Sequence, residues 1–248
     1  MPTYSGRVSS ALAGADARQF SPGELQVADL IVRAILYPTE EVSRIQGAEI
    51  RVVLKWPRAY TELLRDQFRS KVRLIVLEEL PAYVAQFVSE RFVNPHFAPL
   101  FDPIQQLLLR YAIVEQHDSG MYLTPARQED QEQGYTLHTK LERKAGDLLS
   151  AVTAQIPWES STGHRWKGWA EADVPRFLLG PLRFAPFTCC PPRPCCRPNA
   201  KLVYPSQNRP LAATLVALRD IAPDERIVVE WSDMYLLLSS SPLACNVE

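Results

Sequence analysis

The sequence predicts an α+β protein in two parts, an N-terminal helical bundle followed by a compact fold of short strands. Apolar residues recur at helical spacing from about residue 20 to residue 115, and they alternate with polar residues in short runs after residue 134. Prolines outnumber glycines by 21 to 10, so rigid turns separate these elements. We therefore predict a flexible tail over residues 1–19, a helical domain over 20–123, a linker over 124–134 and a strand-rich domain over 135–248.

The first helix is predicted to start at Ser21. This serine is the expected N-cap, Pro22 suits the first helical position, and Glu24 completes a capping box. The helix is amphipathic and ends at Pro38, and its apolar residues are Val27, Leu30, Ile31, Ala34 and Ile35. A second helix start follows at 39–42, and residues 50–54 form an apolar run that fits either a helix or a strand.

Three further helical stretches complete the predicted bundle. One opens at Pro57 and keeps its helical character until Pro81, a second follows Pro81, and the last is capped by Asp102 and Pro103. Their predicted apolar faces are Tyr60, Leu63, Leu64 and Phe68; Tyr83, Val84, Phe87 and Val88; and Leu107, Leu108, Tyr111 and Ile113. We expect the aromatic residues of these faces to lie in the core rather than in a cofactor site.

Short strands are predicted beyond the polar segment 124–134. Residues 135–139 alternate like a strand, whereas 141–149 fit either a helix or a strand–turn–strand around Gly146. The final strands are expected at 211–218 and 226–231, with a tight turn at 223–225. In the last strand, Ile227, Val229 and Trp231 share one face.

Charge and hydropathy exclude several classes of protein. The formal net charge is −1 and no basic run stands out, so the sequence carries no strong nucleic-acid signal. No apolar run approaches the length of a membrane span, and the N-terminus does not resemble a signal peptide. We therefore expect a cytosolic or nuclear protein without a membrane partner.

Four segments in a fixed order carry the functional prediction. Residues 179–181 are followed by Arg183 and Phe184, and after an insertion comes the Cys-x-Pro-Asn step 196–199. Farther along lie Leu218-Arg219-Asp220-Ile221 and the turn 223–225. This order resembles the C-terminal half of the SET-domain protein-lysine methyltransferases, over roughly residues 135–236. Within that family it most resembles the class that methylates the tail of the fourth core histone, whose members also carry an N-terminal helical bundle.

The resemblance implies an activity, a cofactor and a set of site residues. It implies S-adenosylmethionine as methyl donor, a histone tail or another lysine-containing protein as acceptor, a nuclear location, and a C-terminal segment threaded through a loop as a pseudoknot. The cofactor-binding residues that it implies are Gly146, Arg183, Phe184, Cys196 and Asn199, and the residues lining the lysine channel are Trp231 and Tyr235.

Two departures from the family pattern bear on activity. The family's Asn-His pair is replaced by Pro186-Phe187 or, aligned from the other end, by Arg193-Pro194. The family's channel tyrosine becomes Trp231, which keeps an aromatic wall but whose indole N–H only donates, so Tyr235 is the best remaining hydroxyl. These changes favour weak or absent methyl transfer.

Three functional hypotheses follow. The first is a lysine methyltransferase, weak or inactive; the second is a catalytically dead SET relative that serves as a chromatin-associated binding or scaffold module. The third is a helical interaction protein whose C-terminal half is unrelated to SET domains.

A cysteine patch raises the question of zinc. Cys189, Cys190, Cys195 and Cys196 lie within eight residues, and Cys245 follows near the end. The spacing is not that of a zinc ribbon or finger, and four ligands are normally needed. We favour a proline-rigid loop with free thiols over zinc shared by Cys189 or Cys196 with Cys245.

Overall fold

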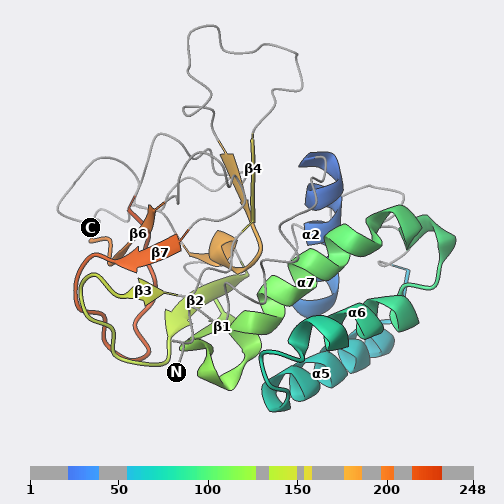
Figure 1. Ribbon diagram of the computed structural model, residues 1–248, viewed down its shortest axis with the longest axis horizontal. Helices are drawn as coiled ribbons and strands as arrows, with labels where there is room; N and C mark the ends of the chain where they lie inside the picture. The colour runs from blue at the N-terminus through green and yellow to red at the C-terminus, as the bar shows by residue number, and fades with distance from the viewer. Residues whose placement is uncertain are drawn as a thin grey trace, which may run out of the picture.

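The computed structural model describes residues 22–38, 55–126, 134–149, 154–157, 176–185, 197–203 and 214–230. It is a mixed helix and sheet structure with small antiparallel sheets, which confirms the predicted α+β class (Figure 1). The helices are α2 (Pro22–Leu36), α5 (Arg58–Leu74), α6 (Leu80–Arg91) and α7 (Phe101–Glu115), with 3-10 helices η1 (Pro95–Leu100), η2 (His117–Ser119) and η5 (Pro181–Phe184). The strands are β1 (Met121–Pro125), β2 (Tyr135–Thr139), β3 (Leu148–Leu149), β4 (Ala154–Pro157), β5 (Arg176–Leu179), β6 (Ala200–Val203) and β7 (Thr214–Ala217).

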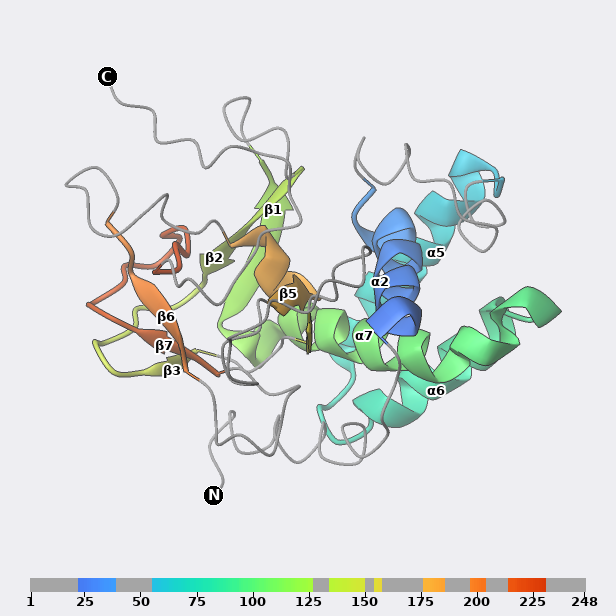
Figure 2. The ribbon, with the colours of Figure 1, turned by 90° about the horizontal axis from the view of Figure 1, so that it is seen from above.

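Helices α2, α5 and α6 pack around α7, and we call these four helices the helical layer. Every residue of α7 from Leu107 to Val114 is buried, because α2, α5 and α6 all pack against this helix (Figure 2). The apolar face predicted for this helix is therefore confirmed. The predicted cap is wrong: the N-cap is Leu100, and Asp102 and Pro103 lie inside the first turn of α7.

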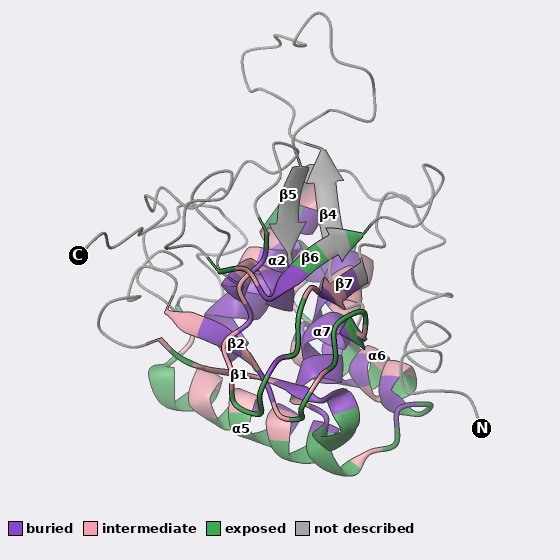
Figure 3. Ribbon diagram, turned by 90° about the vertical axis from the view of Figure 1, so that its left-hand side faces the viewer, coloured by how far each residue is buried: buried purple, intermediate pink, exposed green. Residues whose placement is uncertain are grey.

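Helix α2 is buried on more sides than an amphipathic surface helix. All its residues from Ala28 to Leu36 except Leu30 are buried, including Asp29 and Arg33, whereas Val27 is only half-buried. The prediction of a single apolar face is wrong here, because most of α2 is buried (Figure 3). It contacts α5 and α7 and also β4 and β5, and in Figure 2 it lies between β5 and α5. A helix covered from both sides needs no wide polar stripe.

Two sequence predictions for α5 and α6 are also wrong. The buried residues of α5 are Leu64, Phe68 and Val72, whereas Leu63 keeps 53% of its surface exposed. Helical periodicity alone does not say whether the face is centred on Leu63 or Leu64. Pro81 does not end a helix: α5 stops at Leu74, and Pro81 lies in the first turn of α6. The missing N–H of proline costs nothing there, because first-turn N–H groups have no partner within the helix.

The strands form three small antiparallel sheets, ordered β1–β2, β3–β7–β6 and β4–β5. Strand β2 has the predicted bounds, and it pairs with β1, which includes residues 124 and 125 of the segment predicted as a linker. Residues 141–149 form no helix: Arg143 makes an isolated bridge, Gly146 lies in the turn that follows, and β3 comes next, so the first strand of the strand–turn–strand alternative is a single bridge. The predicted last strand is present as isolated bridges, and the predicted alternation is confirmed for Ile227 and Val229, which are buried.

A buried aromatic cluster joins the helical layer to the strands. Its members are Tyr37 after α2, Tyr111 of α7, Tyr135 of β2 and Phe184 of η5. The Tyr37 ring centroid lies 5.2 Å from that of Tyr111, 5.1 Å from that of Tyr135 and 5.6 Å from that of Phe184. Aromatic pairs at such separations add specific attraction to the burial of their apolar surface.

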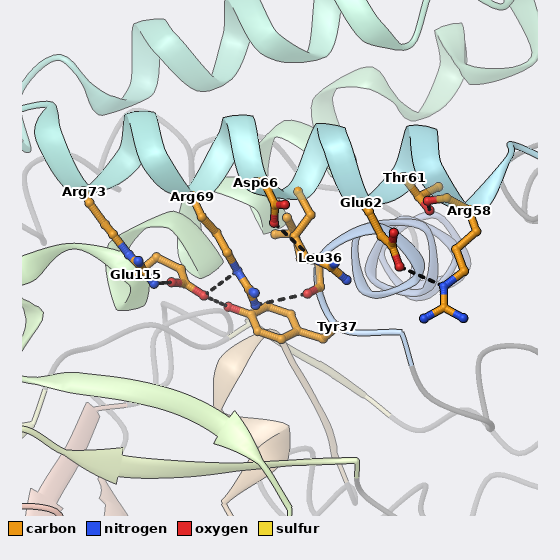
Figure 4. Close-up of polar contacts among 10 residues, drawn as sticks. Leu36, Tyr37, Arg58, Thr61, Glu62, Asp66, Arg69, Arg73 and Glu115 are labelled. Carbon is orange, nitrogen blue, oxygen red and sulfur yellow. Dashed lines mark hydrogen bonds and ion pairs between the residues drawn. The ribbon is translucent and has the colours of Figure 1, made fainter.

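The Tyr37 hydroxyl makes a polar contact that links the end of α2 to α5 and α7 (Figure 4). It donates to Glu115 Oε1 at 2.5 Å, and Arg69 Nε lies 3.1 Å from the same oxygen. The Arg69 guanidinium also lies over the Tyr37 ring, 4.9 Å from its centroid, and donates to Leu36 O. Burial, and next the negative charge of Glu115, hold the pKa of Tyr37 well above its usual value.

Candidate functional site

The Gly146 turn offers the clearest place for a ligand to approach the backbone. Gly146 has φ 89°, and a Cβ added to it would meet no atom within 4 Å. Its N–H donates to Ala217 O at 2.8 Å, and Asp147 O accepts from Ala217 N at 2.9 Å, so β7 holds the turn. A glycine with a positive φ and an open α-carbon lets another molecule contact the main chain.

Asn199 holds the segment 225–228 through its side chain. The side-chain amide donates to Glu225 Oε1 at 2.9 Å and to Arg226 O at 2.7 Å, and Oδ1 accepts from Val228 N at 2.8 Å. The residue is 1% exposed, so these bonds form where water has little access. We call this arrangement the Asn199 clamp.

The clamped segment lies between two strands. On one side Ile227 N donates to Leu137 O of β2 at 2.9 Å. On the other side Glu230 N donates to Ala200 O at 2.7 Å, and Ala200 and Val229 form a parallel bridge. The last described part of the chain therefore runs beside the Pro-Asn step and is bonded to both neighbours.

Arg183 and Phe184 lie in η5, and their side chains are engaged within the protein. Arg183 Nη1 donates to Asp29 Oδ2 at 2.8 Å, and its side chain is 16% exposed. Phe184 is buried in the aromatic cluster, with its ring centroid 5.8 Å from that of Tyr135. Their contacts with a cofactor stay a prediction.

The structure brings some of the predicted cofactor residues together. Gly146 and Asn199 both bond to the end of β7, because Gly146 N donates to Ala217 O and Leu218 N donates to Asn199 O at 2.8 Å. Arg183 and Phe184 join this group indirectly, since η5 and the clamped segment both contact β2. Cys196, Trp231 and Tyr235, with the remainder of the cysteine patch, lie outside the described residues.

Surface charges stabilise the turns on either side of β7. Burial alone would raise the pKa of Glu225, but hydrogen bonds from Arg219, Ala222 N–H and Asn199 outweigh it and hold the pKa below its usual value. Hydrogen bonds from Ala145 N–H and Lys144 lower the pKa of Asp220. The Asp220 bonds tie the turn at 144–147 to the turn at 220–225, and the Glu225 bonds hold the second turn together.

Sequence reasoning missed the buried acid beside η5. Asp29 accepts hydrogen bonds from Arg33, Tyr111, Gly180 N–H and Arg183. Burial and the neighbouring Asp29 carboxylate raise the pKa of Tyr111 well above its usual value. The signal was present, because Asp29 and Arg33 form an i,i+4 pair of opposite charges on a helix face that also carries Ala28 and Val32.

No family model matches the chain, and no curated protein matches it either. Among solved structures, a crystal structure of ATXR5 in complex with mono-methylated histone H3.1 resembles it at 14% sequence identity and a TM-score of 0.32. The alignment covers 49% of this chain and 62% of that one. A likeness this weak carries no argument about fold or activity.

The carboxylates of Asp220 and Glu225 in the described part of the site accept hydrogen bonds from neighbouring turn residues. Within the described ranges, no group of three or more His, Cys, Asp or Glu residues is placed to bind a metal ion, and no helix is long and apolar enough to cross a membrane. A Cβ added to Gly146 would meet no atom within 4 Å, and this turn is joined to the Asn199 clamp through Ala217 and Leu218.

Proposed function

We propose that the chain is a SET-type protein-lysine N-methyltransferase that uses S-adenosylmethionine and acts on a histone tail or another lysine-containing protein in the nucleus. The observation that carries this proposal is the Asn199 clamp, which joins the Pro-Asn step to the segment 225–228 beside β2. The resemblance implies that Asn199 lies on the cofactor side, and that the C-terminal segment threads a loop as a pseudoknot.

We assign each residue of the site a separate role. S-adenosylmethionine would supply a methyl group on a sulfonium, which an amine can attack. Gly146 would let the cofactor approach the main chain, and Asn199 would keep the neighbouring segment in place. Trp231 would form an aromatic wall that attracts the lysine cation, and the Tyr235 hydroxyl would orient the neutral amine. Catalysis of this kind depends mainly on alignment, which rigid hydrogen-bonded turns provide.

A second function is favoured by a separate observation. Arg183, Phe184 and Asn199 already have partners inside the protein, and the family's Asn-His pair is replaced. A proline at that position also removes a backbone donor. We therefore keep as the alternative a non-catalytic SET relative that serves as a chromatin-associated binding or scaffold module.

One experiment separates the two functions. The folded full chain is titrated with S-adenosylmethionine by calorimetry and incubated with core histones and methyl-labelled cofactor. The matched pair of variants is Gly146→Ala, at φ 89°, and Gly134→Ala, at φ 69°, since alanine strains both turns but only the first adds a methyl group at the proposed site.

The methyltransferase proposal expects binding and label transfer in the wild type, affinity at least about tenfold weaker in Gly146→Ala, and little change in Gly134→Ala. Histone binding without heat from the cofactor would support the scaffold alternative. Label transfer that disappears in Tyr235→Phe would eliminate it. A folded wild-type protein that gives neither heat nor transfer would end the methyltransferase proposal.

A further inference from the structure

The carboxylate of Asp29 is buried in the middle of α2 and has a donor at every acceptor position. Oδ1 accepts from Tyr111 Oη at 3.2 Å and from Gly180 N at 2.9 Å. Oδ2 accepts from Arg33 Nε at 3.0 Å and from Arg183 Nη1 at 2.8 Å. The residue is 0% exposed, and a buried charge persists only with such partners.

These four donors come from two parts of the molecule. Arg33 and Tyr111 belong to α2 and α7 of the helical layer. Gly180 and Arg183 belong to the short segment that opens the candidate cofactor region, 151 and 154 positions farther along the chain. One carboxylate therefore bonds both the backbone and a side chain of η5 to the helical layer.

The η5 segment has few local constraints of its own. It is a four-residue 3-10 helix, and no side chain caps it through a hydrogen bond. Its backbone bonds include Arg183 N to Gly180 O at 3.2 Å and Ala185 N to Leu182 O at 3.0 Å. Gly180 has φ 80° and ψ −163°, a region that essentially only glycine occupies and that persists when the surroundings determine it.

We infer that Asp29 is a positioning residue for the candidate cofactor segment, through which the helical layer fixes the conformation of residues 180–184. The bonds to Gly180 N–H and to the Arg183 guanidinium hold the turn at both of its ends. The effect of Asp29 on cofactor affinity rests on the proposed function, whereas its effect on the conformation of residues 180–184 does not.

The test compares Asp29→Asn with Val32→Ala in the full chain. Asparagine keeps the shape of the side chain but turns an N–H₂ group toward donors of Arg33 and Arg183. Val32 is also completely buried in α2, and its truncation destabilises the helical layer without altering the carboxylate. Both variants are studied at a temperature at which each is fully folded.

Hydrogen exchange of the Gly180 and Arg183 amides is the first measurement, with the Lys140 amide, which bonds to Gly120 O, as internal reference. We expect Asp29→Asn to accelerate exchange at Gly180 and Arg183 about tenfold more than Val32→Ala does, with equal changes at Lys140. Equal acceleration in both variants would show a merely structural role and overturn the inference.

Affinity for S-adenosylmethionine is the second measurement, and we expect it to fall about tenfold more in Asp29→Asn than in Val32→Ala. If the wild-type protein binds no cofactor, the proposed function fails, and the exchange comparison still decides the role of Asp29. Should Asp29→Asn not fold, Arg183→Met leaves the Asp29–Arg33 pair intact. Faster exchange at Gly180 in that variant supports the inference, and unchanged exchange overturns it.

Discussion

Replacing Asn199 by alanine removes three hydrogen bonds to the segment 225–228. Glu225 keeps its bonds to Arg219 and Ala222 N–H, so its carboxylate is not left unpaired. The Arg226 carbonyl and the Val228 N–H lose their bonds to the side chain, in a place that is only partly open to water. We therefore expect the main cost to come from these two backbone groups.

The size of the loss follows from the two backbone groups. Leaving one buried polar group without a partner costs about 1–3 kcal/mol, and partial access to water reduces that cost. We expect Asn199→Ala to lower the free energy of unfolding by about 2–4 kcal/mol. Asn94→Ala is the control, because Asn94 makes one exposed bond, from His96 N–H to its Oδ1 at 3.0 Å, and should cost about 1 kcal/mol or less.

A second substitution at the same position should change how the free energy of unfolding depends on pH. Asn199→Asp keeps an oxygen for Val228 N–H but places the other against Arg226 O and Glu225 Oε1. Repulsion raises the pKa of the introduced carboxyl group, so the variant should recover stability relative to the wild type as the pH falls and that group gains a proton. Urea titrations between about pH 4 and 8 measure both effects. An Asn199→Ala cost no larger than that of Asn94→Ala would refute the clamp.

Three further outcomes are expected. Gly120→Ala should cost about 1–3 kcal/mol in thermal unfolding, because φ is 70°, whereas the Arg143 guanidinium that the new Cβ would meet ends a flexible side chain and can move; a cost near zero would contradict this geometry. Stability should fall as the pH rises above about 10, because the unfolded chain ionises there while burial and Glu115 keep Tyr37 protonated; Tyr37→Phe should flatten that slope in alkaline urea titrations, and an unchanged slope would refute the cause. Stability should also fall as the pH drops below about 4.5, since Glu225 has a lowered pKa in the fold; Glu225→Gln should weaken this acid dependence, and acid unfolding identical to the wild type would contradict the role of the carboxylate.

The buried residues of α6 and α7 were predicted better than those of α2 and α5. The apolar spacing of α6 gave the buried residues Val84, Phe87 and Val88, and the residues predicted for α7 are buried because the whole stretch from Leu107 to Val114 is covered. The pattern failed at Pro81, since proline is compatible with both the end of one helix and the first turn of the next. It also failed at α2, whose second covering comes from strands β4 and β5, far along the chain.

The candidate site was predicted only in part, for physical reasons. Order along the sequence identified Asn199 and Gly146, and the structure gives them a common neighbour in the end of β7. The partners of Asn199 and Arg183 were not predictable, because each side chain bonds to groups that only the tertiary fold brings close. Asp29 was missed because an acidic residue on a helix is expected at the surface unless the groups that donate hydrogen bonds to it are known.

The distance along the sequence between Asp29 and Gly180 has a consequence for biosynthesis. The two residues are 151 positions apart. At ~5–20 residues per second, a nascent chain spends roughly 8–30 s on the ribosome with Asp29 made and its partners in η5 still missing. During that interval water fills the acceptor positions that Gly180 and Arg183 later occupy. The Asp29 carboxylate therefore gains its last two donors only after residue 183 has been made and has left the ribosome.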